Sequence, residues 1–195
     1  MPASNCLEIL LDSEDTKIVR APLRLTPKGD PFENDAITYN LTNPFRSIWN
    51  DVLSKSMLVN SKIPVVGITF EGPLFHRSLV ESIGLPEKKI FIFGDDTEFF
   101  IRAYKAGWKS LIYRDAVLNR KLEAQNDPSD FNWKTYYMVR NIIAIDVLHA
   151  SILVRIIRPW GYLISWLKRA GNKENRKIVW KAFRDGYFYK SENTP

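Results

Sequence analysis

Hydrophobic and polar positions change period several times along the first 125 residues, which predicts short helices and strands in succession. Helical spacing occurs at residues 5–11, 45–59 and 74–83. Strand-like runs occur at 17–25, 64–70, 110–113 and 116–118, and residues 27–31 have the composition of a turn. At 195 residues the chain is long enough for one domain with a real core. The pattern predicts an α/β fold.

Residues 89–107 read as a strand, a tight turn and a helix. The apolar run 90–93 has the length of a buried strand, Gly94 permits a sharp change of direction, and Gly107 stands where the helix would end. Three carboxylates open the helix, on Asp95, Asp96 and Glu98. Ligands of open α/β sheets bind beyond the carboxyl ends of strands, so acids at this position indicate chemistry.

A structural interpretation of the same acids stays open. Asp95 and Glu98 have the spacing of a capping box, and the helix dipole favours acids in the first turn. One cap does not need the adjacent Asp96, which adds like-charge repulsion. The extra aspartate is favoured where a cation or a substrate hydroxyl uses it.

From residue 132 the chain becomes helical and rich in aromatic residues. The pattern predicts a helix from 132 to about 158 that Pro159 breaks, an aromatic segment at 160–169 and a basic helix at 173–184. The stretch 142–167 is apolar enough to raise the question of a membrane span. Its charged residues, each costing about 2.5–3.5 kcal/mol at a bilayer centre, argue against one; they are Asp146, Arg155 and Arg158.

The net charge of +6 is unevenly distributed. Residues 1–154 carry 18 basic and 19 acidic side chains, whereas residues 155–195 carry 10 and 3. Aromatic residues beside many cations are typical of a segment on an anionic membrane surface; they are Trp160, Tyr162 and Trp166, with Lys168, Arg169, Lys173, Arg176, Lys177 and Lys181. The alternative is that these helices pack on the domain with a solvated basic face. Nucleic-acid binding is disfavoured, because no nucleic-acid fold signature accompanies the basic tail.

Cysteine usage and the N-terminal sequence bear on the compartment. The single cysteine, Cys6, excludes an internal disulfide and fits a reducing compartment. The first residues lack the pattern of a secretory signal peptide.

Several motifs follow one another in a specific order. They are Gly67-Ile-Thr-Phe-Glu-Gly-Pro-Leu-Phe, Ile83-Gly-Leu-Pro, Phe91-Ile-Phe-Gly-Asp-Asp-Thr-Glu, Arg102-Ala, Lys105-Ala-Gly, residues 133–141, and Ala182-Phe-Arg-Asp-Gly. In this combination the chain resembles the second half of family 2 glycosyltransferases, above all bacterial rhamnosyl- and galactofuranosyltransferase-like members. The resemblance implies a partial GT-A fold at 1–125 that lacks its N-terminal nucleotide-binding strands. A helical, basic, membrane-associating region at 126–195 would follow.

The resemblance also implies roles for individual residues. Asp96 corresponds to the catalytic base, while Asp95 and Glu98 would help to hold the acceptor hydroxyls. The wall of the acceptor cleft would include Gly67, Phe70, Glu71, Gly72 and Arg102.

The chain departs from the family pattern in two respects. The family's early strands and its Asp-x-Asp motif would precede the segment at 2–11, so we expect a chain that starts at Met1 to be inactive without a partner that supplies them. The family uses Mg²⁺ or Mn²⁺, but where many relatives have a histidine ligand this chain has Arg120, preceded by Asn119. An arginine pairs with a diphosphate and does not ligate a metal, so no metal ligand is assigned. His76 and His149 are expected to be structural or surface residues.

The sequence therefore predicts an inverting glycosyltransferase that uses a nucleotide-sugar donor and a glycan or lipid-linked acceptor. It would act in bacterial surface polysaccharide or cell-wall glycan synthesis, in the cytoplasm and peripheral to the inner face of the cell membrane. The alternative is a non-catalytic remnant, or one subunit of a split enzyme, that binds a membrane surface or a partner chain.

Overall fold

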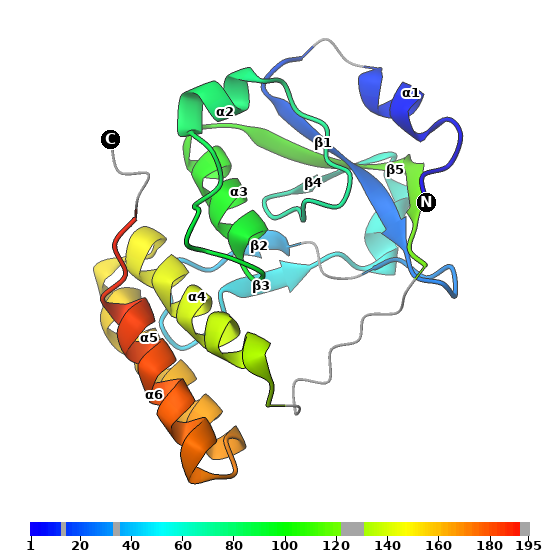
Figure 1. Cartoon of the computed structure of the whole chain (residues 1–195). Coiled ribbons are helices and arrows are strands. Elements are labelled where there is room, and N and C mark those ends of the chain that lie inside the picture. Colours follow the sequence, from blue (N-terminus) through cyan, green and yellow to red (C-terminus); the bar gives the residue numbers. More distant parts are fainter. Residues whose placement is uncertain (13–14, 33–35, 122–130, 192–195) are drawn as a thin grey trace. The chain divides into compact units, whose positions relative to one another are not determined.

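The computed structural model describes residues 1–12, 15–32, 36–121 and 131–191, which form five strands and six α-helices in a mixed α/β arrangement (Figure 1). These residues belong to two compact units. The first comprises Met1–Tyr39, Trp49–Gly84 and Phe99–Gln125, and the second Asn40–Ile48, Leu85–Glu98 and Asn126–Pro195. The predicted boundary between residues 125 and 126 lies outside the described residues.

The first unit contains a mixed three-stranded sheet of order β1-β5-β4 (Figure 1). The central strand, β5 (Lys109–Asn119), runs parallel to β1 (Ile18–Leu25) and antiparallel to β4 (Lys62–Val65). β1 confirms the predicted strand, whereas β4 ends earlier than the predicted one. The two strands predicted at 110–113 and 116–118 are one strand, β5, whose register against β1 shifts between Pro22 and Leu23.

The amphipathic helix predicted at 45–59 is not formed. Instead β3 (Trp49–Val52) pairs antiparallel with β2 (Ala36–Tyr39), and a 3₁₀-helix follows at Lys55–Val59. The Asn40 side chain holds the loop that precedes β3: its Nδ2 donates to the Asn43 carbonyl at 2.8 Å, and its Oδ1 accepts from the Asn43 N–H at 2.9 Å. Local side-chain bonds of this kind offer the backbone an alternative to a helix.

The first unit also contains two short helices. α1 (Cys6–Leu11) is the helix predicted at 5–11. α2 (Ser78–Ile83) begins four residues later than predicted, because Leu74 exchanges backbone hydrogen bonds of 2.7 and 2.8 Å with Arg20 of β1. α2 ends at Gly84, as predicted, with a φ of 78°.

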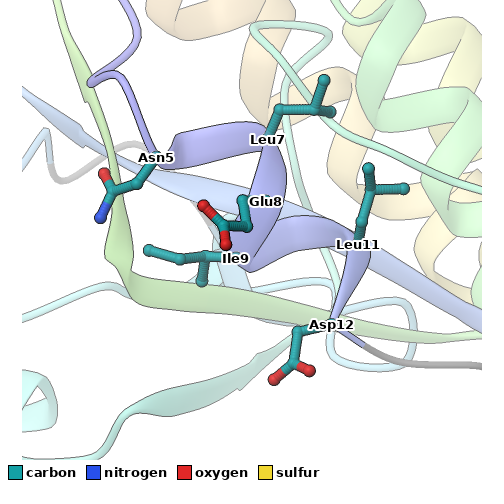
Figure 2. Close-up of a pocket in the computed structure, with 6 residues that line it drawn as sticks. All are labelled: Asn5, Leu7, Glu8, Ile9, Leu11 and Asp12. Atoms are coloured by element: carbon teal, nitrogen blue, oxygen red, sulfur yellow. The ribbon is translucent and has the colours of Figure 1, made fainter.

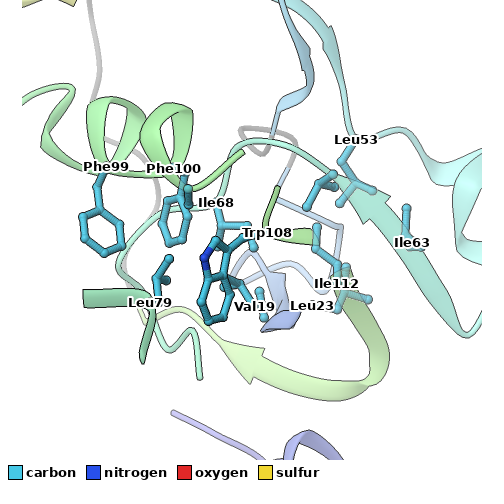
Figure 3. Packing of buried hydrophobic residues seen from close by; sticks show 13 residues of the cluster. Val19, Leu23, Leu53, Ile63, Ile68, Leu79, Phe99, Phe100, Trp108 and Ile112 are labelled. Atoms are coloured by element: carbon cyan, nitrogen blue, oxygen red, sulfur yellow. The ribbon is translucent and has the colours of Figure 1, made fainter. Parts of the chain in front are cut away.

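The core of the first unit joins the sheet to α3 (Asp95–Lys105) and α2. Figure 3 shows Phe99 and Phe100 of α3 pointing into the same cluster as Trp108. The sheet contributes apolar side chains from one of its faces, among them Val19, Leu23, Ile63 and Ile112.

The second unit contains three helices that pack on one another: α4 (Trp133–His149), α5 (Ile152–Arg169) and α6 (Lys173–Tyr187) (Figure 1). Asn132 and Thr135 form a capping box at the start of α4. The predicted break at Pro159 is wrong. The chain turns at Ala150 and Ser151, where the Ser151 N–H donates to the Leu41 carbonyl at 2.8 Å, and Pro159 lies inside α5.

A buried ion pair joins α4 to α5. Arg158 Nε donates to Asp146 Oδ2 at 2.8 Å, and its Nη1 donates to the Asn40 carbonyl at 2.8 Å. Burial raises the pKa of Asp146, and the nearby Arg158 offsets part of that shift. Burial, followed by the charge of Asp146, raises the pKa of Tyr162 to about 12. Because Arg158 pairs with Asp146 and binds the Asn40 carbonyl, the rotation of α5 about its own axis is fixed, and Arg158 points inward.

Within the described ranges, no helix combines the length and the apolar character that crossing a membrane requires.

The contact between α4 and α6 makes Gly186 sensitive to substitution. A Cβ at this position would lie 2.5 Å from the Arg140 carbonyl oxygen and 3.0 Å from Ile143 Cβ. We expect Gly186→Ala to lower the free energy of unfolding by about 1–3 kcal/mol, since a rigid backbone atom must move. Urea denaturation measures the change.

Gly161 of α5 is the matched control, because a Cβ there would meet nothing within 4 Å. Gly161→Ala should raise stability by up to about 1 kcal/mol through helix propensity. Equal effects of the two substitutions would contradict the close helix packing.

Candidate functional site

The segment that leads into the acidic motif is irregular, and the strand predicted at 90–93 is absent. Ile92 has a φ of 70°, a left-handed conformation that β-branched residues rarely adopt. The Asn141 side-chain amide donates to the Phe91 carbonyl at 3.1 Å and to the Phe93 carbonyl at 2.7 Å. One amide of α4 thus supplies hydrogen bonds that a neighbouring strand would have supplied.

Asn141 is completely buried and is itself held in place. Arg140 Nε donates to Asn141 Oδ1 at 2.8 Å, and the same guanidinium donates to the Lys89 carbonyl. Asn141 is not among the candidate residues that the sequence indicates. It could have been recognised as a polar amide directly before the apolar run 142–145, in a helix whose other residues suit a hydrophobic core.

The acidic helix itself begins where the sequence predicts. Gly94 has a φ of 80°, and its carbonyl accepts the Glu98 N–H at 2.9 Å in the first turn of α3. A Cβ at Gly94 would lie 2.8 Å from Ile145 Cδ1, so the position needs glycine for both conformation and space. Gly107, with a φ of 81°, follows the last turn, as predicted.

One face of α4 holds this segment at three points. Asn141, Ile145 and His149 lie four residues apart and therefore share a face. Asn141 binds the backbone before Gly94, Ile145 packs against Gly94, and His149 pairs with Glu98. The position of the acidic turn is thus set by α4.

Asp95 and Asp96 are both half-buried at the start of α3. Asp96 Oδ1 accepts the Thr97 N–H at 2.6 Å and the Thr97 hydroxyl at 3.3 Å. These bonds fix the orientation of the Asp96 carboxylate. An oriented carboxylate with access to solvent can accept a proton from a bound hydroxyl.

Glu98 differs from the two aspartates because it is buried. Its Oε1 lies 3.0 Å from His149 Nε2, and the side chains of Glu98 and His149 are 3% and 11% exposed. From the sequence, His149 is expected to be a structural or surface residue. The structure places it against the acidic motif, as the last residue of α4.

The predicted cleft residue Glu71 belongs to a charged cluster in the first unit. Its carboxylate lies 3.0 Å from Arg24 Nη1 and 3.5 Å from Arg120 Nη2. Both guanidinium groups lie over the Phe32 ring, at 4.7 and 3.8 Å from its centroid. Two guanidinium groups therefore face one carboxylate at the carboxyl ends of β1 and β5.

Gly72, next to Glu71, is a point of close approach. It has a φ of 84°, and a Cβ there would lie 3.0 Å from Leu118 Cδ1 and 3.3 Å from Pro22 Cγ. Asn119, also predicted to lie near the diphosphate, is exposed at the end of β5.

Arg102, Phe70 and Gly67 have roles in packing within the first unit. The Arg102 guanidinium donates to the Ile83 carbonyl in the last turn of α2 and lies over the Phe99 ring. Phe70 contacts the Phe99 and Phe100 rings, with centroids 5.5 and 5.6 Å apart. Gly67 is buried.

The predicted residues thus form two groups, one in each unit. The second unit holds Asp95, Asp96 and Glu98, and the first holds Gly67, Phe70, Glu71, Gly72, Arg102, Asn119 and Arg120. Among the described residues, no group of three or more His, Cys, Asp or Glu side chains is arranged to hold a metal ion. A guanidinium group has no lone pair to offer a cation, so Arg120 is not assigned as a metal ligand.

A hollow of about 780 Å³ lies along α1, lined by Asn5, Leu7, Glu8, Ile9, Leu11 and Asp12 (Figure 2). None of the predicted site residues lines this hollow. It is consequently no part of the candidate site.

No protein-family model matches the sequence, and no curated protein is detectably similar to it.

The Glu98–His149 pair can be tested by a double-mutant cycle. We expect Glu98→Gln and His149→Gln each to cost about 1–3 kcal/mol of unfolding free energy, because each disturbs a buried charge-assisted contact. The double variant should cost less than the sum, with a coupling of at least about 0.5 kcal/mol. Urea denaturation of the four proteins measures it.

His76→Gln serves as the control, because His76 is exposed and bonded to the Ser78 hydroxyl beside it. It should change stability by less than about 0.5 kcal/mol. Strict additivity of the Glu98 and His149 substitutions would show that the two side chains do not interact.

Proposed function

We propose that this chain carries the acceptor side of an inverting glycosyltransferase that uses a nucleotide-sugar donor. The proposed process is bacterial surface polysaccharide or cell-wall glycan synthesis, with a glycan or lipid-linked acceptor. The proposal starts from the ordered motifs that resemble family 2 glycosyltransferases.

A single structural observation supports the proposal most. Asp95 and Asp96 stand half-exposed in the first turn of α3, on a segment that α4 fixes through Asn141 and Ile145. A general base works best when it is held in a set orientation beside the proton that it takes. The bonds from Thr97 give the Asp96 carboxylate a set orientation.

In the proposed reaction, an acceptor hydroxyl oxygen attacks the anomeric carbon of the donor sugar. The bond from that carbon to the diphosphate breaks as the new bond forms on the opposite face. Asp96 takes the hydroxyl proton, and the nucleoside diphosphate leaves with the electron pair of the broken bond.

The charged cluster around Glu71 suits the diphosphate end of the reaction. Arg24 and Arg120 both lie beside Glu71, and guanidinium groups recognise phosphate oxygens well. No step is assigned to a metal ion.

A second candidate is a non-catalytic interaction module. It is favoured by the pairing of two predicted acceptor-side carboxylates, Glu98 with His149 and Glu71 with arginines. Carboxylates held in this way stabilise a fold without contacting a substrate. In either case we propose peripheral association with the inner face of the cell membrane, supported by the basic C-terminal helices.

Complementation of a deletion strain separates the two candidates. We expect the wild-type gene to restore the sugar content of the surface glycan and Asp96→Asn to fail at equal protein level. Loss of a general base typically costs about 10²–10⁴-fold in rate. Analysis of the glycan monosaccharides measures the outcome.

Glu81→Gln is the matched control, because Glu81 is an exposed acid of α2 paired with Arg77. It should restore the glycan fully. Restoration by Asp96→Asn to the wild-type level would reject Asp96 as the base and favour the interaction module.

A further inference from the structure

One face of α5 is buried. Val154, Arg158 and Leu163 are buried, and Arg158 binds Asp146 as well as the Asn40 carbonyl. Tyr162 also turns toward this buried pair, whose charges influence its pKa. The inward face fixes which side chains α5 presents on its other side.

The outward face of α5 is an apolar stripe. Ile152, Ile156, Trp160 and Ile164 follow at four-residue spacing and are 75%, 54%, 47% and 53% exposed. Trp160 is anchored by the Phe183 ring of α6, with centroids 4.8 Å apart. A continuous row of exposed aliphatic side chains on one helix is a mark of an interaction surface.

The loop before β3 extends the stripe. Phe45 is 84% exposed, and with Trp160 and Ile164 it lines an open hollow of about 590 Å³. The Arg46 carbonyl accepts from Arg158 Nη1 at 3.2 Å, which ties the loop to α5. We call Phe45, Ile152, Ile156, Trp160 and Ile164 the α5 face.

The two segments that form the α5 face carry charges of one sign. Residues 44–47 and α5 contain no acidic residue, and their exposed cations include Arg46, Arg155 and Lys168. Protein interfaces depend on aromatic and arginine anchors with a mixed polar rim. An aliphatic stripe with one tryptophan and only cations beside it complements an anionic lipid surface instead.

We propose that the α5 face inserts into the headgroup region of an anionic bilayer, with Arg46, Arg155 and Lys168 contacting lipid phosphates. The proposal rests on the membrane association proposed above and is independent of glycosyl transfer. The proposed membrane surface differs from the one expected from the sequence. Trp160 belongs to the α5 face, whereas Tyr162 and Trp166 are partly buried.

The test is co-sedimentation of the whole protein with vesicles of phosphatidylglycerol and phosphatidylcholine. The variant Ile152→Glu/Ile156→Glu places two carboxylates on the α5 face and replaces no buried residue. We expect the partition coefficient to fall at least about tenfold, since apolar area is lost and anionic lipid repels the new charges. Binding of the wild type should weaken at high salt and on phosphatidylcholine alone.

The matched control is Leu7→Glu/Leu11→Glu on α1. Leu7 and Leu11 are 60% and 59% exposed, and the charge change is the same. This control should bind vesicles as the wild type does. Circular dichroism melting checks that both double variants fold.

Three outcomes would overturn the inference in distinguishable ways. Equal binding of the wild type and Ile152→Glu/Ile156→Glu would reject the α5 face but keep membrane association. No binding of the wild type would reject both, and would leave glycosyl transfer to be decided by Asp96→Asn. A wild-type dimer that the α5 variant dissociates, without vesicle binding, would assign the face to a second copy of this chain and contradict the proposal.

Discussion

The second unit depends on the hydrogen bonds of one buried amide. Asn141 lies in an apolar part of α4 and donates to two carbonyls of the segment before the acidic turn. A buried amide without partners is costly, so the helix and the segment hold each other in place. Ile145 and His149 continue the same face, and together the three residues determine where Asp95, Asp96 and Glu98 stand.

Elements with a strong local signal were predictable from the sequence. α1, β1, α3 and α6 follow from periodicity, glycine positions and cap residues, and all four are present. The predictions at 45–59 and 90–93 are wrong because hydrophobic spacing does not reveal the contacts that these segments make. Within 45–59, β3 pairs with β2, and the Asn40 side chain binds the Arg46 and Ser47 carbonyls. At 90–93 the Asn141 side chain binds the Phe91 and Phe93 carbonyls.

The candidate site shows the same division between local and long-range information. The acids of α3 were visible as a motif, and their place at a helix start was predictable. That Glu98 pairs with His149, and Glu71 with Arg24 and Arg120, depends on contacts between residues dozens of positions apart. These pairs divide the predicted acids into two kinds: Asp95 and Asp96 remain half-exposed, whereas Glu98 is buried and Glu71 is paired.

The central claim is that Asp96 takes the proton of the acceptor hydroxyl. The most direct measurement is the rate of sugar transfer by Asp96→Ala, assayed together with the partner that supplies the nucleotide-binding part, at saturating donor and acceptor, with and without added formate as a small external base. The account predicts a rate about 10²–10⁴-fold below wild type that formate partly restores. Transfer by Asp96→Ala at the wild-type rate without formate would contradict it.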